Sequence, residues 1–370
     1  MKERFHGIDF HKNYSTIQVL DRAGKPIELI NKCKDLDKYI FSLDDKDAVA
    51  IEMSTGVFKV AGQIREQGAQ CEIVNPYRFK IITDSWKKTD KVDAMALAEG
   101  IWIHVTSERR SLPTVHTPQP VVIELRKLFS LYDLLTKTIT QYKNAVRAAF
   151  RDARIELNEK QSAKLFGYTI DEVKSFLESK GISEVSILLV TTSLQALAVI
   201  TAQKDQLIDK IYETSRPLQD QVELLMSIKG VSAFLAIAYL SEVDDPKRFK
   251  KVKQLYAYLG VVPTTNSSGG KTKHGHCVKA SRKLCRTLFT QSIHHIVASN
   301  PKYESDYEEL KRRRGAGRAR MAFMRKIFGV MRRMLINNEP FRWVNERLYN
   351  NKLREYRRKL KKMEELKKTA

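Results

Sequence analysis

Short apolar segments fill the first hundred residues and constrain the class of fold that this chain can adopt. Each has the length of a β-strand, and polar turn-forming residues, such as 21–26, separate neighbouring segments. The expected elements are strands at 5–10, 15–20, 26–31, 48–52 and 71–75 and helices at 34–43, 57–67 and about 90–101. Three consecutive strands followed by alternating helices and strands predict a mixed α/β sheet domain.

Four acidic residues lie where this pattern can place metal ligands. Asp9 ends the first strand, Glu52 ends the fourth, and Asp90 and Asp93 lie three residues apart at the start of a predicted helix. Carboxylates at this spacing share one face of a helix. Such oxygen ligands suit Mg²⁺, and a pair of these ions about 3.5–4 Å apart promotes phosphodiester cleavage. The pattern therefore predicts an enzyme that cuts nucleic acid.

Each acid also has a purely structural interpretation. Asp9 could cap the turn after its strand, and Glu52 could be stabilised by the dipole of the helix that begins near Gly56. Asp90 could be a helix N-cap, and Asp93 an ordinary first-turn acid. These interpretations explain any one of the four residues but not their joint occurrence.

From residue 118 onward the pattern becomes helical. Leucines recur at three- and four-residue steps over about 118–154, and a second long helix is expected at 185–213. With the polar segment 155–183 between them, the two helices predict a coiled-coil arm. Either dimerisation or packing within one chain would satisfy the apolar stripe.

A compact helical region is predicted from Leu224. The segment LLMSIKGVSAFLAIAYL indicates two helices joined by a tight turn at Gly230, similar to a helix-hairpin-helix that binds phosphate backbones. Ser232 occupies the place where that motif carries a second glycine. Helices are expected at 247–259, from about 279, at 303–336 and at 341–367.

The positive charge of the chain is concentrated in its last third. The net charge is +23, yet residues 1–245 carry 33 basic and 34 acidic side chains. Residues 246–300 contain 11 basic and no acidic residues, and residues 301–370 contain 22 basic and 9 acidic ones. Such concentration favours a phosphate-binding surface, although the final helix could also be an exposed, solubilising tail.

The segment PTTNSSGGKTKHG, residues 263–275, is predicted to be a loop with its own chemistry. Glycines permit close approach to a substrate, lysines neutralise phosphate, and a serine hydroxyl can act as a nucleophile. Ser, Gly and Thr are also ordinary residues of a surface loop, so this segment alone leaves both interpretations open.

Taken in order, several segments resemble one protein family. They are GIDFHK, IEMSTG, NPYRFK and KTDKVDAMALAEG in the first hundred residues, then SIKGVSAFLAIAYLSEV, RFKKVKQLYAYLGVVP, the serine loop and KASRKLCRTLF. The family comprises bacterial insertion-sequence transposases with an N-terminal DEDD domain and a C-terminal serine domain. Pilin-gene invertases and bridge-RNA-guided recombinases belong to this group.

The resemblance implies a RuvC-like, RNase H-fold domain in which Asp9, Glu52, Asp90 and Asp93 bind Mg²⁺. It also implies that Ser268, five residues after Pro263, is the nucleophile that forms a phosphoserine–DNA link, with Ser267 as the neighbouring alternative. Expected partners are donor and target DNA, a structured guide RNA, and further copies of the chain in a dimer or tetramer.

We expect four regions: a catalytic domain at 1–112, a helical arm at 113–220, a serine domain at 221–340 and a basic tail at 341–370. Side chains expected to contact nucleic acid lie in and after the serine loop: Lys271, Lys273, Arg282, Lys283 and Arg286. A metal-only junction nuclease and a non-catalytic nucleic-acid binder are the alternative functions.

The absence of a recognised signal segment favours a cytoplasmic protein, and the resemblance implies a bacterial one associated with the nucleoid. Four cysteines in a chain of 370 residues agree with a reducing compartment. The apolar run at 233–240 is too short to cross a membrane, so no membrane partner is expected.

Overall fold

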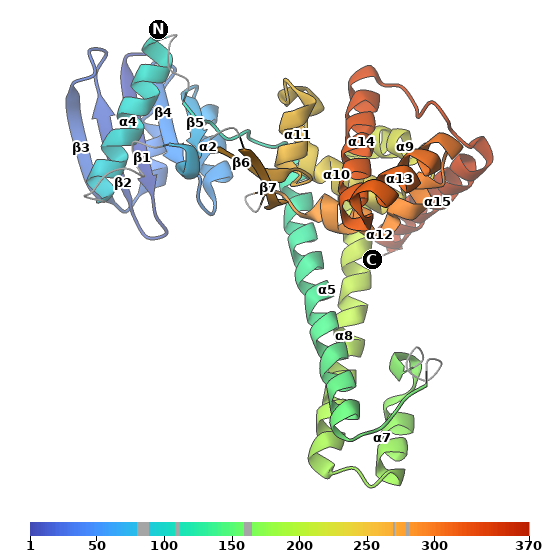
Figure 1. Cartoon of the computed structure of the whole chain (residues 1–370). Helices are drawn as coiled ribbons and strands as arrows, with labels where there is room; N and C mark the ends of the chain where they lie inside the picture. The colour runs from blue at the N-terminus through green and yellow to red at the C-terminus, as the bar shows by residue number, and fades with distance from the viewer. Residues whose placement is uncertain (80–88, 108–111, 159–164, 269–270, 279–280, 370) are drawn as a thin grey trace. The chain divides into compact units, whose positions relative to one another are not determined.

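The computed structural model divides the chain into two units, Met1–Thr117 and Pro118–Ala370. Figure 1 shows the elements of both units. The structure describes residues 1–79, 89–107, 112–158, 165–268, 271–278 and 281–369.

A five-stranded mixed sheet forms the centre of unit 1, as the sequence predicts. Its strands are β1 (Arg4–Phe10), β2 (Ser15–Leu20), β3 (Pro26–Cys33), β4 (Asp47–Glu52) and β5 (Gln70–Val74). They lie in the order β3-β2-β1-β4-β5. β1 is antiparallel to β2 and parallel to β4, which is parallel to β5. Successive side chains of a strand point to opposite faces of the sheet, so both faces of the central strands must be shielded from solvent.

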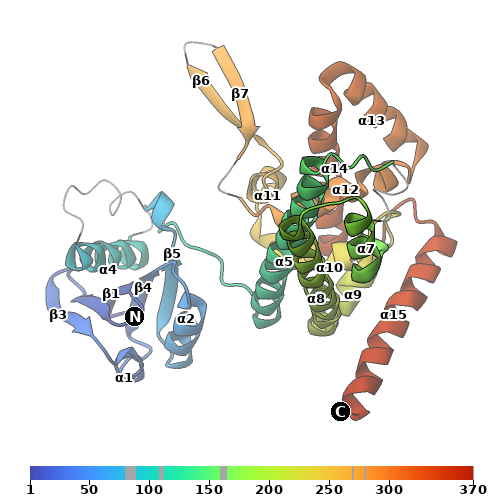
Figure 2. The same cartoon turned by 90° about the horizontal axis from the view of Figure 1, so that it is seen from below.

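Helices cover both faces of this sheet. α1 (Leu36–Phe41) and α2 (Val57–Glu66) pack against Ile8, Ile51 and their neighbours. α4 (Asp90–Thr106) packs on the opposite face, against Phe5 and Ala50 (Figure 1, Figure 2). A short 3₁₀ turn, Pro76–Arg78, follows β5. Because the strand ends and the α4 N-terminus carry the predicted acids, this layering determines where those acids lie.

Two long antiparallel helices form the predicted arm in unit 2 (Figure 1). They are α5 (Pro120–Asp152) and α8 (Glu184–Thr214), within two residues of the predicted limits. The intervening polar segment is not merely a connection, because it contains the 3₁₀ turn Leu165–Gly167 and α7 (Ile170–Ser179). Thr169 and Glu172 form a capping box at the start of α7, a signal that the sequence interpretation missed.

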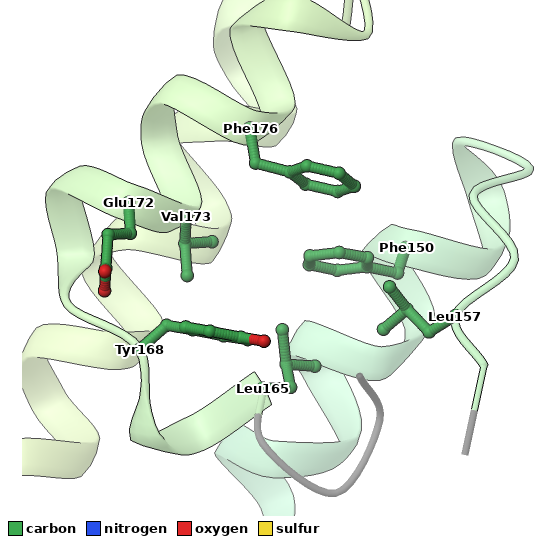
Figure 3. Close-up of a pocket in the computed structure, with 7 residues that line it drawn as sticks. All are labelled: Phe150, Leu157, Leu165, Tyr168, Glu172, Val173 and Phe176. Carbon is green, nitrogen blue, oxygen red and sulfur yellow. The ribbon is translucent and has the colours of Figure 1, made fainter. Parts of the chain in front are cut away.

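The tip of the arm has a small core of its own. Phe150 of α5 stacks on Phe176 of α7 with ring centroids 6.4 Å apart. Beside them is a mainly apolar pocket of about 290 Å³ (Figure 3). Its lining residues are Phe150, Leu157, Leu165, Tyr168, Glu172, Val173 and Phe176.

A helical bundle makes up the rest of unit 2. Its elements are the 3₁₀ turns Arg216–Leu218 and Pro246–Arg248 and helices α9 (Gln219–Met226), α10 (Ala233–Val243), α11 (Val252–Tyr258), α12 (Leu284–Val297), α13 (Pro301–Arg314), α14 (Ala316–Asn337) and α15 (Glu346–Thr369). α10 is the central helix, because nearly all its side chains are buried. The single helix predicted at 303–336 is two helices, because the chain turns at Gly315, whose φ is 79°.

The predicted serine loop is instead a β-hairpin. β6 (Pro263–Ser268) and β7 (Lys271–Cys277) pair in antiparallel register. Two residues, Gly269 and Gly270, connect the strands and lie outside the described part of the chain. Two strand-length runs separated by Gly-Gly are a hairpin signal that the loop prediction did not use.

The basic tail is docked rather than free. Tyr356 and Leu360 of α15 are buried in the core of unit 2. Lys352 Nζ donates hydrogen bonds to the carbonyl oxygens of Met226, Ile228 and Val231. Arg357 pairs with Glu223 on α9. The apolar stripe of this helix therefore has an intramolecular partner.

Among the described helices, α8 alone is long and apolar enough to cross a membrane by length and composition. The expectation from the sequence considered only the shorter run in α10. α8 pairs along α5, and a core or coiled-coil helix can pass the same test, so this property is weak evidence for a span.

Candidate metal centre and serine hairpin

Strand pairing places Asp9 and Glu52 together at the carboxyl edge of the sheet. β1 and β4 are parallel with Ile8 opposite Ile51, so the next residue of each strand is an acid on the same face. That face is the one covered by α4, because Phe5 and Ala50, which share it, pack against α4. Asp9 is 6% exposed and Glu52 is half-buried.

A close approach of helix to strand brings the second pair of acids to the same face. A Cβ atom on Gly7 would meet the Ala94 carbonyl oxygen at 2.0 Å, so only glycine allows α4 to lie so near β1. Thr89 caps α4 by accepting a hydrogen bond from Val92 N at 3.4 Å. Asp90 and Asp93 then lie in its first turn, where the helix dipole favours negative charge.

A histidine lies between Asp9 and Asp90, hydrogen-bonded to the first and within ion-pair distance of the second. His11 Nε2 lies 3.0 Å from Asp9 Oδ2 and 3.7 Å from Asp90 Oδ1. The Tyr14 hydroxyl donates to Asp90 Oδ2 at 3.0 Å. The structure thus brings Asp9 and Asp90 together and adds His11 and Tyr14, which the sequence interpretation did not select.

The electrostatics of this cluster resist the accumulation of negative charge. Burial raises the pKa of Asp9; His11 lowers it, while the charges of Asp90 and Asp93 raise it further. The hydrogen bond to Asp90 raises the pKa of Tyr14. Carboxylates that destabilise one another in a partly buried site favour a bound cation.

The donor set fits a divalent metal. One ligand atom from each of Asp9, His11 and Asp90 lies within 4.8 Å of the others. Carboxylate oxygens suit hard cations, whereas an imidazole nitrogen also suits transition metals. The signal that could have identified His11 is its place two residues after Asp9, in the turn between paired strands.

The hairpin that carries the predicted serine belongs to unit 2. Its backbone register pairs Ser268 with Lys271, Ser267 with Thr272 and Asn266 with Lys273. The predicted nucleophile and Lys271 therefore end the two strands opposite each other, beside the Gly-Gly connection.

Two arginines anchor the base of this hairpin. Arg286 Nη1 donates to the Gly260 carbonyl at 2.8 Å, and Arg325 Nη1 donates to the Val261 carbonyl at 2.6 Å. Val278 N also donates to Val262 O at 3.1 Å. These bonds fix the start of β6 and the end of β7 to the bundle.

The basic residues predicted at the start of a helix have different environments. α12 begins at Leu284 rather than near 279, so Arg282 and Lys283 precede it. Arg282 forms a two-point ion pair with Glu242 at 2.7 and 2.8 Å, and Glu242 is 2% exposed. Lys283 is exposed. Two of the three predicted phosphate contacts, Arg282 and Arg286, thus also stabilise the fold.

The helix-hairpin-helix-like turn packs inside the bundle. Gly230 has φ of 85°, and a Cβ atom there would meet main-chain atoms of His295 and Ile296 at 2.8 Å. Ser232 N-caps α10 by accepting a hydrogen bond from Leu235 N at 3.3 Å. Contact with α12 therefore accounts for the glycine, and capping accounts for the serine, without a phosphate ligand.

Comparison with protein families matches both units. A model of the DEDD transposase domain of IS110-type elements matches residues 6–154. A model described as the transposase IS116/IS110/IS902 family matches residues 222–308. The two models match in the same order as the two units.

Individual relatives agree with this assignment. The transposase for insertion sequence element IS1111A of Coxiella burnetii is 24% identical over 74% of this chain and 74% of its own length. The transposase for insertion sequence element IS1328 of Yersinia enterocolitica is 22% identical over 77% of this chain and 81% of its own. A putative transposase of Sinorhizobium fredii, y4qE, is 37% identical over 18% of this chain and 17% of its own.

The DEDD match covers the sheet, the four acids and the first arm helix, and the second match covers the bundle around α10. A DEDD domain indicates use of a divalent metal, in agreement with the cluster around Asp9. With the ordered match of both domain models and the long matches to two transposases, the chain belongs to the IS116/IS110/IS902 family of insertion-sequence transposases.

Proposed function

We propose that this protein cleaves and rejoins DNA strands with a Mg²⁺-dependent carboxylate site and Ser268 as the nucleophile. The observation that carries the proposal is the approach of Asp9 of β1 to Asp90 in the first turn of α4, with Glu52 ending the adjacent parallel strand. Family membership supplies DNA as the substrate class. The resemblance noted from the sequence supplies the serine.

The proposed chemical step is a transesterification. Ser268 Oγ forms a bond to phosphorus while the bond from phosphorus to the 3′ oxygen breaks. The serine hydroxyl loses its proton, and the departing oxygen gains one, so a phosphoserine link and a free 3′-hydroxyl result. Attack by the 3′-hydroxyl of a partner strand reverses the step and restores the serine.

Each predicted residue has a role in this scheme. Asp9, Glu52, Asp90 and Asp93 would hold the cation, and His11 would orient Asp9. Bound Mg²⁺ would stabilise negative charge at the scissile phosphate. Lys271 and Lys273 of β7 neutralise backbone phosphates, together with Lys283 and the outward surface of Arg282 and Arg286.

We also propose that the protein acts as an oligomer through its arm. Large apolar side chains are exposed along both arm helices: Leu131, Leu134, Val185, Leu188, Leu189 and Val199. Such residues at helical spacing favour a further helix packing on this surface. A structured guide RNA and action at the nucleoid in the cytoplasm complete the proposal, supported by the basic last third of the chain.

A trapped covalent intermediate tests the serine assignment. Purified protein is incubated with Mg²⁺ and labelled element-end DNA that carries a nick near the cleavage site, and adducts are resolved by denaturing gel electrophoresis. Ser268→Ala should abolish the adduct, whereas the neighbouring Ser267→Ala should retain it. The reverse pattern would move the nucleophile to Ser267.

A metal-only nuclease is the alternative that the acid cluster also supports. It predicts Mg²⁺-dependent cleavage products without a protein-linked strand, in the wild type and in Ser268→Ala alike. A non-catalytic binder predicts retained DNA without cleavage under any metal condition. The same gel separates the three outcomes.

A further inference from the structure

The turn between α13 and α14 carries a dense patch of positive charge. Six of the ten residues 311–320 are Lys or Arg, and no acid occurs between Glu309 and Glu339. We define the basic corner by the exposed arginines of this turn that form no ion pair with a described acid: Arg312, Arg314 and Arg318. The family model for this unit ends at residue 308, so the patch lies beyond the matched segment.

Aromatic packing and an ion pair join the two helices that carry the basic corner. Tyr303 and Tyr307 of α13 pack edge-to-face on Phe323 of α14, with ring centroids 5.1 and 5.8 Å apart. Lys326 and Asp306 add an ion pair at 2.8 Å. Figure 2 shows the two helices as neighbours in the bundle. The three arginines therefore lie at the junction of two helices that pack on each other.

Two of the other basic residues of the turn are neutralised by acids of α13, but these three are not. Lys311 pairs with Glu308 at 3.1 Å, and Arg313 pairs with Glu309 at 3.2 Å. Arg312, Arg314 and Arg318 are exposed and have no ion pair or hydrogen bond to another described residue. Their charges are available to an external anion.

Helix dipoles explain only part of this arrangement. Cations in the last turn of α13 are stabilised by its negative end, which accounts for Arg312 and Arg314. Arg318 instead lies in the first turn of α14, where a cation is unfavourable. That turn contains no acid, and its N-cap, Gly315, has no side chain to cap it. A bound anion would offset both the unfavourable position of Arg318 and the missing N-cap of α14.

We infer that the basic corner binds the phosphate backbone of a nucleic-acid duplex outside the catalytic site. Guanidinium groups pair with phosphate in two-point geometry, and a chain of phosphates matches several arginines on a rigid turn. The choice of a nucleic acid over an acidic protein rests on the family's action on DNA. It does not depend on the serine chemistry or on Mg²⁺.

Equilibrium binding without catalysis tests this inference. The probes are a 30-base-pair DNA duplex of arbitrary sequence and an RNA duplex of the same sequence, measured by fluorescence anisotropy with EDTA present. All proteins carry Ser268→Ala, so failure of the proposed reaction leaves the result intact. The variant is Arg312→Gln, Arg314→Gln and Arg318→Gln together.

The control variant removes three charges elsewhere in unit 2: Lys137→Gln, Lys174→Gln and Lys210→Gln on the arm, whose side chains are all more than half exposed. The corner variant should lose roughly tenfold to a hundredfold in affinity for at least one probe near 100 mM salt. The slope of log affinity against log salt should decrease by about 2–3, at about 0.9 for each lost DNA phosphate contact.

A loss of affinity of the corner variant for the DNA probe, the RNA probe or both supports the inference, and it identifies which nucleic acid supplies the phosphates. Equal affinity of the corner and control variants for both probes would overturn it, as would absence of binding by the parent protein. Matching circular dichroism melts show that the substitutions leave the fold intact, as expected for exposed side chains.

Discussion

Gly7 of β1 and Ala94 of α4 are in contact through their main chains, with room for no side chain at Gly7. A Cβ atom there would lie 2.0 Å from the Ala94 carbonyl oxygen. Asp9 follows two residues after Gly7, and Asp93 directly precedes Ala94. The distance between the strand acid and the helix acids is therefore set by a main-chain contact rather than by the acids themselves.

Substitution of Gly7 by alanine should displace α4 and weaken the metal site. Overpacking against backbone atoms should cost about 3 kcal/mol of the free energy of unfolding of unit 1. Differential scanning calorimetry should show a lower Tm for the transition of this unit. Gly62→Ala is the matched control, because a Cβ at Gly62 in α2 meets nothing within 4 Å. Alanine there should be neutral or stabilise by about 1 kcal/mol.

Substitution of Asp9 by asparagine should have opposite effects on stability and metal binding. Loss of one charge relieves repulsion from Asp90 and Asp93, so the metal-free protein should gain about 1 kcal/mol. Affinity for Mn²⁺ or Mg²⁺, measured by isothermal titration calorimetry, should fall at least about tenfold, as expected for a lost carboxylate ligand. Asp45→Asn, at an exposed position, makes the same change in charge and is the control. Equal metal affinities of the two variants would contradict a metal role for Asp9.

Acid should destabilise unit 1 through Asp47. Burial raises the pKa of this carboxyl, but hydrogen bonds from His6, Arg4 and the backbone of Asp44 outweigh it and bring the pKa to about 2. The distances from Asp47 Oδ1 to Arg4 Nε and His6 Nε2 are 2.6 and 3.0 Å. Because the pKa is lower in the folded state, the stabilisation is complete above about pH 4 and disappears as the pH falls through 2.

The full pH effect should be about 2 kcal/mol, because folding lowers the pKa of Asp47 from its ordinary 3.8 to about 2. Hydrogen exchange of peptides from β1 and β4, compared at pH 5 and pH 3 after correction for the intrinsic exchange rate, should show about half of this loss, because folded Asp47 is still largely ionised at pH 3. Asp47→Asn should be less stable at pH 5 and should vary less with pH. An unchanged pH dependence in this variant would assign the acid sensitivity to other groups.

Charges placed on the exposed apolar surface of the arm should disrupt self-association. Leu188 is 66% exposed and Val199 is 58% exposed, so lysine at both positions should leave the monomer folded. Burial of these lysines in an oligomer interface would remove their hydration, so association should become unfavourable. Light scattering coupled to size exclusion should therefore give a lower mass for the lysine variant than for the wild type. Asn350→Lys with Asn351→Lys adds the same charge on α15 and should preserve the mass. Identical masses for all three proteins would exclude the arm as the interface.

Substitution of Lys352 by methionine should release α15. Three carbonyl oxygens, of Met226, Ile228 and Val231, would lose their shared donor, at a cost of about 2–3 kcal/mol. Hydrogen exchange of residues 346–365 should accelerate, while exchange in unit 1 stays constant. Lys362→Met, at an exposed position of the same helix, should leave α15 protected. Equal protection in both variants would mean that apolar packing of Tyr356 and Leu360 is sufficient.

Local sequence patterns predicted the regular elements well. Strands β1–β5 alternate or run apolar between turn residues, and α5 and α8 repeat leucine at helical spacing, so each element carries its own signal. α7 and the β6–β7 hairpin were missed even though Thr169–Glu172 and Gly269–Gly270 are recognised local signals. In both cases polar composition was interpreted as a loop, which shows that composition is a weaker guide than cap and turn chemistry.

Contacts between distant segments were beyond local patterns. His11 and Tyr14 become members of the acid cluster only when β1, β2 and α4 assemble. Glu242 neutralises Arg282 across 40 residues of chain, and Lys352 binds carbonyls more than 120 residues away. A basic residue in the sequence does not reveal whether its partner is a buried acid, a main-chain carbonyl or a phosphate.

The sequence by itself determined the mixed sheet, the arm, the four acids and their family, because periodicity, turn residues and ordered motifs are local properties. The tertiary structure alone decided which side chains meet: His11 with Asp9, Arg282 with Glu242, and α15 with the bundle. The physical reason is that such contacts depend on strand register and on close approaches such as that of Gly7 to α4, which arise from packing over the whole unit.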